Sequence, residues 1–198
     1  MKDLIFIDCV LREYHGRDTH YEIPTGVTAI GEEAFYACTE LESIIIPDSV
    51  TIIGVRAFSD SGLTSVALPD SIVEIHDEAF CSVELTDVTI PKSVTYIGIG
   101  VFSSCRNLIF INVDIQNPSY TSIDGVVYNK DLTTIIAFPS GRSGSFAVPE
   151  TTTVIGEQAF CGCKQLTEIK MNDGVTRIDN DAFRYCTNLS SVHIPPSV

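Results

Sequence analysis

The sequence predicts a single, mainly β solenoid. We expect a parallel sheet on one face of the stacked coils, short turns or single-turn helices on the other face, and an inserted β-hairpin. A motif of the form Pro-x-x-Val-x-x-Ile-Gly-x-x-Ala-Phe recurs every 22–23 residues, apart from one interval of 58, and its copies begin at Pro24, Pro47, Pro69, Pro91, Pro149 and Asn172. A segment of the form Leu-x-x-Ile-x-Ile follows each copy, and its alternation of apolar and polar residues indicates a strand with one buried face. A fixed period of this size is typical of a solenoid, in which each unit buries its apolar face against its neighbours.

We expect one domain over residues 1–198. Its parts are an N-terminal cap hairpin (1–23), four repeats (24–113), a hairpin interruption (114–148), two repeats (149–194) and the start of an incomplete repeat (195–198). Residues 7–11 of the cap parallel residues 123–127 of the interruption, and both segments lead into a repeat that begins with proline. We therefore interpret both as versions of one hairpin-containing unit that opens a run of coils, the first of them covering exposed strand hydrogen bonds.

Charge excludes two classes of partner. The chain has 26 acidic and 12 basic residues and a formal net charge of −14. Nucleic-acid binding requires a basic footprint, and anionic membranes likewise attract basic segments, so neither is expected. No stretch of apolar residues is long enough for membrane insertion. The simplest interpretation of the acidity is solubility, and the alternative is attraction of a cationic partner or a divalent cation.

Two repeat positions describe the inside of each coil. We expect the phenylalanine that follows a small residue to fill the interior; these residues are Phe35, Phe58, Phe80, Phe102, Phe160 and Phe183. The glycine position of the motif is occupied by Gly31, Gly54, His76, Gly98, Gly156 and Asp179. Since these residue types tolerate positive φ, the pattern predicts a tight turn with left-handed backbone there.

Four of the seven cysteines occupy one repeat position, three residues after a repeat phenylalanine: Cys38, Cys105, Cys163 and Cys186. We expect a column of buried thiols, because cysteine in such a position behaves as a small hydrophobic residue. A bridge between Cys163 and Cys186 in adjacent coils is the alternative, since strands about 4.8 Å apart lie within disulfide reach. Thiols spread along a solenoid do not converge on one tetrahedral point, so no metal site is predicted.

The remaining candidates for chemistry are weak. Cys9, His15 and His20 are close in sequence, but nothing places an oxyanion donor beside them. The chain contains no calcium-binding loop motif and no phosphate-binding glycine motif. We therefore expect a protein that is not an enzyme and that has no cofactor.

The functional prediction concerns the solvent face of the repeat sheet. The outward positions that we select as candidate partner-binding residues are Ile45, Ala67, Asp87, Thr89, Phe110, Asn112, Glu168, Lys170 and His193. Ile45 and Phe110 are apolar and are candidate anchors for a partner; the alternative is that they are covered, Phe110 by the adjacent hairpin. An exposed sheet face with apolar anchors predicts that the protein is a protein-interaction or adhesion scaffold. A structural element that associates with other copies through an open C-terminal edge is the alternative function.

The repeat Ile-Pro-Asp-Ser-Val-x-x-Ile-Gly-x-x-Ala-Phe-x-x-Cys-x-x-Leu-x-x-Ile-x-Ile-Pro resembles that of the BspA-type leucine-rich repeat proteins. The interruption, which begins at residue 117 with Asn-Pro-Ser-Tyr, is also typical of that family. The resemblance implies a leucine-rich-repeat solenoid, a cell-surface or secreted location, and adhesion to host matrix proteins or other cells, with no catalytic residues. Residues 1–8 lack the apolar centre of an export signal, so Met1 as the native start would imply the cytoplasm, whereas a leader already removed would fit the cell surface.

Overall fold

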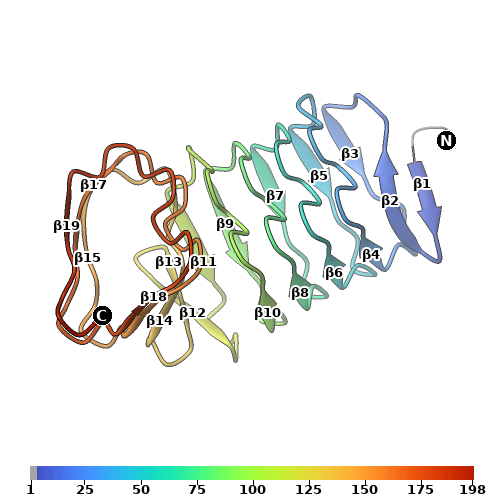
Figure 1. Cartoon of the computed structure of the whole chain (residues 1–198). Helices are drawn as coiled ribbons and strands as arrows, with labels where there is room; N and C mark the ends of the chain where they lie inside the picture. The colour runs from blue at the N-terminus through green and yellow to red at the C-terminus, as the bar shows by residue number, and fades with distance from the viewer. Residues whose placement is uncertain (1–3) are drawn as a thin grey trace.

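A computed structural model describes residues 4–198 of the chain. They form a β-solenoid of about eight turns, and the described residues contain no helix. Consequently, no helix within residues 4–198 is long and apolar enough to cross a membrane. Figure 1 shows the coils from the cap to residue 113 side by side, and we call these the first stack. The coils from residue 114 onward, the second stack, are seen nearly end-on in the same view, so the two stack axes are strongly inclined.

One side of the first stack is a six-stranded sheet with the order β1-β2-β4-β6-β8-β10. Its strands are β1 (Leu4–Ile7), β2 (Val10–Tyr14), β4 (Ala29–Ile30), β6 (Ile52–Ile53), β8 (Glu74–Ile75) and β10 (Tyr96–Ile97). β1 and β2 form the antiparallel hairpin of the cap, and the remaining pairs are parallel. The register aligns Ile30 with Ile53, and Ile53 with Ile75. Like side chains therefore form columns.

The Leu-x-x-Ile-x-Ile segments form the second side, and their strands pair in parallel as predicted. Together with one strand from the cap and one from the interruption, β3 (His20–Glu22) and β15 (Gly144–Ala147), they make three separate sheets. The first contains β3, β5 (Ser43–Ile45) and β7 (Ser65–Ala67), and the second contains β9 (Asp87–Ile90) and β11 (Phe110–Val113). The third contains β15, β17 (Leu166–Lys170) and β19 (Ser191–His193). The first sheet ends at β7, and a new one starts at β9. The predicted sheet is therefore real but not continuous.

The interruption is built as the sequence predicts. β12 (Tyr120–Ile123) and β13 (Val126–Asn129) form an antiparallel hairpin, and β13 then pairs with β14 (Thr134–Ala137). β14 begins a parallel ladder with β16 (Val154–Ile155) and β18 (Arg177–Ile178). The hairpin turn at Asp124 and Gly125 has φ values of 50° and 75°, and the cap turn at Asp8 and Cys9 has values of 51° and 63°. Both are two-residue turns with left-handed backbone, which matches the strand twist of a hairpin.

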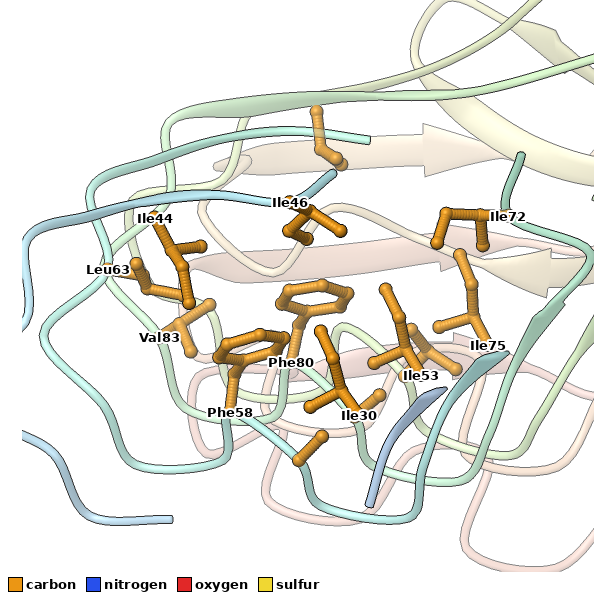
Figure 2. Packing of buried hydrophobic residues seen from close by; sticks show 14 of the residues in the cluster. Ile30, Ile44, Ile46, Ile53, Phe58, Leu63, Ile72, Ile75, Phe80 and Val83 are labelled. Atoms are coloured by element: carbon orange, nitrogen blue, oxygen red, sulfur yellow. The ribbon is translucent and has the colours of Figure 1, made fainter. Parts of the chain in front are cut away.

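The phenylalanine column fills the interior of the coils. The rings of Phe35, Phe58, Phe80 and Phe102 are stacked, with successive centroids 5.1, 5.2 and 5.8 Å apart. Figure 2 shows Phe58 and Phe80 face to face in the core of the first stack, between isoleucine and leucine side chains. In the second stack Phe160 lies 5.1 Å from Phe183. The prediction that these rings are core is confirmed for five of the six, and Phe183 in the last coil is half-buried.

Each hairpin unit adds an aromatic residue that the motif does not contain. The Tyr14 ring lies 5.1 Å from that of Phe35, at the start of the first column. Phe138 takes the same place in the second stack, 4.8 Å from Phe160. The cap and the interruption therefore each supply the first ring of a column, and sequence analysis missed both residues.

The segment between the glycine and the end of each coil is a series of turns, so the alternative of single-turn helices is wrong. Its left-handed residues are Glu33, Arg56, Glu78, Gly100, Gln158 and Asp181, and, four residues later in each coil, Ala37, Asp60, Ser82, Ser104, Gly162 and Tyr185. Because left-handed residues recur at these positions, several backbone N–H groups of each coil point toward the next coil. Phe35 donates to the carbonyl of Ala57 at 2.7 Å, and Phe58 donates to that of Ala79 at 2.8 Å. We call this hydrogen-bonded third side the turn face.

The predicted left-handed backbone at the motif glycine is wrong. Gly54 is not among the glycines with positive φ, which are Gly26, Gly100, Gly125, Gly144 and Gly162. Instead, a Cβ added to Gly54 would lie 2.7 Å from the carbonyl carbon of Gly31 in the preceding coil. Glycine is used here because neighbouring backbones approach too closely for a side chain.

The two stacks meet at an elbow formed by residues 98–106 and 156–164. The N–H of Ser104 donates to the carbonyl of Cys161 at 3.2 Å. The backbone hydrogen bonds of the turn face therefore continue from the first stack into the second. Phe138 donates to the carbonyl of Ala159 at 2.8 Å, and Gly141 donates to that of Leu108 at 2.8 Å. The hairpin unit therefore lies beside this junction and changes the direction of the solenoid.

Candidate functional site

The predicted partner-binding residues lie on the second side of the solenoid, in three strips. The first strip, on β5 and β7, contains Ile45 and Ala67, which are aligned in adjacent strands. Both side chains are exposed, and that of Ile45 is 62% exposed. The interior residue Ile44 of the same strand is buried. The alternation that predicted an outward Ile45 is therefore correct.

The second strip, on β9 and β11, contains Asp87 opposite Phe110 and Thr89 opposite Asn112. Phe110 is 48% exposed. Its ring packs on the hairpin turn, since a Cβ added to Gly125 would lie 2.7 Å from the Cδ1 atom of Phe110. The structure thus combines the two interpretations made from sequence: the hairpin supports one part of the ring and leaves the other open to solvent.

The third strip lies on β17 and β19 in the second stack. Lys170 is aligned with His193, and Glu168 lies on the same strand as Lys170 with their charged groups 3.6 Å apart. Lys170 and His193 are exposed, and Glu168 is half-buried. Figure 1 places β17 and β19 on the far side of the second stack from β5 and β9. The nine selected residues therefore do not form one continuous surface.

A groove of about 300 Å³ separates the first strip from the second, where the sheet is interrupted between β7 and β9. Three carboxylates line it, those of Asp70, Asp87 and Asp114. One of them is paired: Asp70 Oδ2 lies 2.9 Å from Lys92 Nζ. Sequence analysis selected only Asp87, because the interruption of the sheet has no signature in the repeat. The first stack therefore presents an acidic groove between two exposed apolar residues, Ile45 and Phe110.

The residues considered for catalysis are not brought together. Cys9 is exposed in the cap turn. His15 Nε2 lies 3.4 Å from Glu13 Oε2, and His20 Nδ1 lies 2.7 Å from the hydroxyl of Ser43. The polar partner of each histidine is thus Glu13 or Ser43 and not the thiol.

The seven cysteines are free thiols in this structure. Within the predicted column, Cys105 and Cys163 are buried, while Cys38 and Cys186 are half-buried. Burial raises the pKa of Cys105 to about 12. Burial also raises the pKa of Cys163, whereas a hydrogen bond with Cys163 lowers the pKa of Cys186. Among residues 4–198, no three histidine, cysteine or acidic side chains gather in a way that could hold a metal ion.

Comparison with known families identifies the repeat. The model of the BspA type leucine rich repeat region matches six copies, over residues 14–135 and 135–198. The chain belongs to the BspA-type leucine-rich repeat family. Proteins of this family and the similar structures are generally non-enzymatic repeat scaffolds. A comparison of this BspA-type chain with curated protein sequences finds no match.

Solved structures of leucine-rich repeat proteins share the fold of this BspA-type chain. The pneumococcal vaccine antigen PcpA is 27% identical with a TM-score of 0.82, over 91% of this chain and 51% of that protein. A leucine-rich repeat protein from Eubacterium ventriosum is 26% identical with a TM-score of 0.74, over 88% of this chain and 56% of that one. A leucine rich cell surface protein from Faecalibacterium prausnitzii is 25% identical with a TM-score of 0.62, over 94% and 72%. The chain thus spans about half the length of the first two.

Proposed function

We propose that this chain is a non-enzymatic scaffold that binds a protein partner through the outward side of the first stack, between Ile45 and Phe110. The observation that carries the proposal is the arrangement of two exposed apolar side chains on either side of an acidic groove. Apolar anchors close to the centre of an interface commonly supply most of the binding energy. The rigid ladders of β5 with β7 and of β9 with β11 hold these anchors in fixed positions.

The partner is expected to combine apolar and basic side chains. Asp70, Asp87 and Asp114 line the groove, and the chain as a whole carries a net charge of −14. Complementary charge speeds encounter and favours a basic partner over an acidic one. The likeness to a cell surface protein supports a location at the cell surface, where a host matrix or cell-surface protein would be the partner.

The test compares affinity capture by the parent with capture by Ile45→Glu and Phe110→Glu. A protein captured by the parent is purified, and its affinity is measured for each variant. We expect both variants to weaken binding at least tenfold, because each places a charge in a desolvated contact. Ile7→Glu is the matched control, since Ile7 is 55% exposed but lies on the cap. Unchanged affinity of both variants would place the binding surface elsewhere.

The alternative function, association of copies through the C-terminal edge, has support from one observation. Val192 on β19 and the following Ile194 are 39% and 59% exposed, and β19 pairs only with β17 among the described strands. Light scattering over a range of concentrations tests it. A monomer at every concentration would rule out this mode of assembly for residues 1–198.

A further inference from the structure

A second recess lies at the elbow, on the turn face and away from the strips described above. This groove has a volume of about 530 Å³. Residues 82–84, 104 and 106 of the first stack line one part of it, and residues 162, 164, 185 and 187 of the second stack line the other. Its size falls within the range of small-ligand sites, and it exists only because the two stacks meet.

The floor of the groove includes Gly162, whose lack of a side chain allows Ser104 to pack directly against it. On the turn face, Gly162 occupies the coil next to that of Ser104, and its φ is 78°. A Cβ added to Gly162 would lie 2.7 Å from Cα of Ser104. The hydroxyl of Ser104, like that of Thr187 across the groove, has no hydrogen-bond partner among the described residues. Two polar groups are thus free to bind a ligand.

Two cationic side chains, Lys164 and Arg106, line the groove. Lys164 is exposed and forms no ion pair with a described residue. Arg106 contacts Glu84 through Nε, at 3.1 Å from Oε2, and through Nη2. These contacts neutralise Glu84 and leave the Nη1 group of Arg106 without a partner among residues 4–198, on a side chain that is 74% exposed. The groove therefore offers an anion the ammonium group of Lys164 and one open edge of the Arg106 guanidinium.

An aromatic ring completes the wall. Tyr185 is 56% exposed and borders the groove. The guanidinium of Arg184 lies 4.7 Å from the centre of its ring and donates a hydrogen bond to its hydroxyl at 2.9 Å. Arg184 in turn pairs with Asp181 at 3.1 Å. The ring is therefore held in place and offers an apolar surface beside the free hydroxyl groups.

We propose that the elbow groove binds a sugar acid, that is, a hexuronate ring with a carboxylate. The carboxylate would pair with Lys164 and with Nη1 of Arg106. The sugar hydroxyls would bond to Ser104 and Thr187, and the C–H face of the ring would lie on Tyr185. A free uronate and the terminal residue of an acidic glycan carry the same recognised chemistry. This site is independent of the protein-binding face proposed above.

The test is calorimetric titration of the chain with D-glucuronate at low ionic strength, with D-glucose as the neutral analogue. We expect saturable binding of one glucuronate that weakens with added salt, and no binding of glucose. Lys164→Gln should weaken binding by about five- to tenfold, because it removes a charge-assisted hydrogen bond. Lys92→Gln removes the same charge from an exposed pair in the first stack and should leave the affinity unchanged.

A variant expected to bind glucuronate more tightly provides a second test, because a loss of folding would not increase affinity. Glu84→Gln removes the carboxylate that occupies Arg106, so we expect glucuronate to bind more tightly than it does to the parent. A disaccharide ending in glucuronate should bind more tightly than the free acid if the natural ligand is a glycan, and equally well if it is the free acid. Three results would each overturn the proposal: no saturable glucuronate binding to the parent, equal losses in the Lys92 and Lys164 variants, or binding of hexaglutamate without binding of glucuronate.

Discussion

Gly162 and Ser104 belong to different stacks, yet they lie in such close contact that no Cβ fits between their backbones. Ser104 donates a backbone hydrogen bond across the junction to the carbonyl of Cys161, and Gly162 donates to that of Arg184 in the next coil of the second stack. One continuous hydrogen-bonded row therefore crosses the elbow between residues that are more than fifty positions apart in the sequence.

Gly162→Ala should destabilise the chain through both backbone strain and a clash with Ser104. Gly26→Ala is the matched control, because Gly26 also has positive φ, at 95°, but has nothing within 4 Å of an added Cβ. We expect Gly162→Ala to lower the free energy of unfolding by about 1–3 kcal/mol more than Gly26→Ala does. Urea unfolding monitored by circular dichroism measures the difference. Equal effects would show that the stacks separate easily at this point.

Phe58→Ala should cost about 3–5 kcal/mol of unfolding free energy, because it empties the centre of the first ring column. Phe58 is fully buried between Phe35 and Phe80, with ring centroids 5.1 and 5.2 Å away. Phe110→Ala makes the same chemical change at a side chain that is 48% exposed and should cost much less. Thermal unfolding of both variants provides the comparison, and a similar loss in both would contradict the core assignment.

Asn117→Ala should be strongly destabilising, although the change is small. This side chain is fully buried, and its Nδ2 group donates to the carbonyls of Pro91 and Val94 at 2.8 and 2.9 Å. Its Oδ1 atom accepts from the N–H groups of Ser119 and Tyr120 at 2.9 and 2.8 Å. Loss of these partners leaves buried polar groups unpaired, at a cost of about 3 kcal/mol or more. Asn188→Ala, at an exposed position, is the control, and denaturant unfolding reports both values.

Stability should decrease in alkaline solution. Burial raises the pKa of the Cys105 thiol from 9.0 to about 12, so above pH 9 the unfolded chain loses a proton that the folded chain retains. This contribution is complete below pH 9 and is lost as the pH rises toward 12, at up to about 1.4 kcal/mol per pH unit. Burial likewise raises the pKa of Tyr14 and Tyr128 to about 12 from 10.0, so both act in the same direction.

The measurement is the free energy of unfolding in urea at about pH 8 and about pH 10. Cys105→Ala removes one titrating group, and we expect a smaller decrease between the two pH values than in the parent. Cys9→Ala is the control, since Cys9 is exposed in the cap turn and should leave the pH dependence unchanged. A parent whose stability is the same at both pH values would contradict the burial of these groups.

The period of 22–23 residues was sufficient to predict the stacking, the ring column and the parallel strands, because each depends on contacts that repeat in every coil. The glycine position was misinterpreted because glycine serves either positive φ or close approach, and the sequence does not distinguish the two. Tyr14 and Phe138 were missed because they lie outside the motif, although each comes just before a repeat in equivalent units.

The candidate site was less predictable than the fold. Alternation along the strands correctly placed Ile45 and Phe110 outward. It gave no sign of the interruption between β7 and β9 or of the contact between Ser104 and Gly162, since both depend on how coils distant in sequence meet. For the same reason the acidic groove and the elbow groove could be identified only from the structure.

The turn face also gives the molecule a direction. The N–H groups of residues 33, 35 and 37, and those at the same places in the next two coils, all donate to carbonyls of the following coil, as in the bond from Phe35 to Ala57. A coil can therefore be followed only by another in the same orientation, because a reversed coil would place its N–H groups opposite those of its neighbour. Growth of such a protein by duplication is accordingly one-way: copied segments extend it from head to tail, and each copied hairpin unit sets where the path bends.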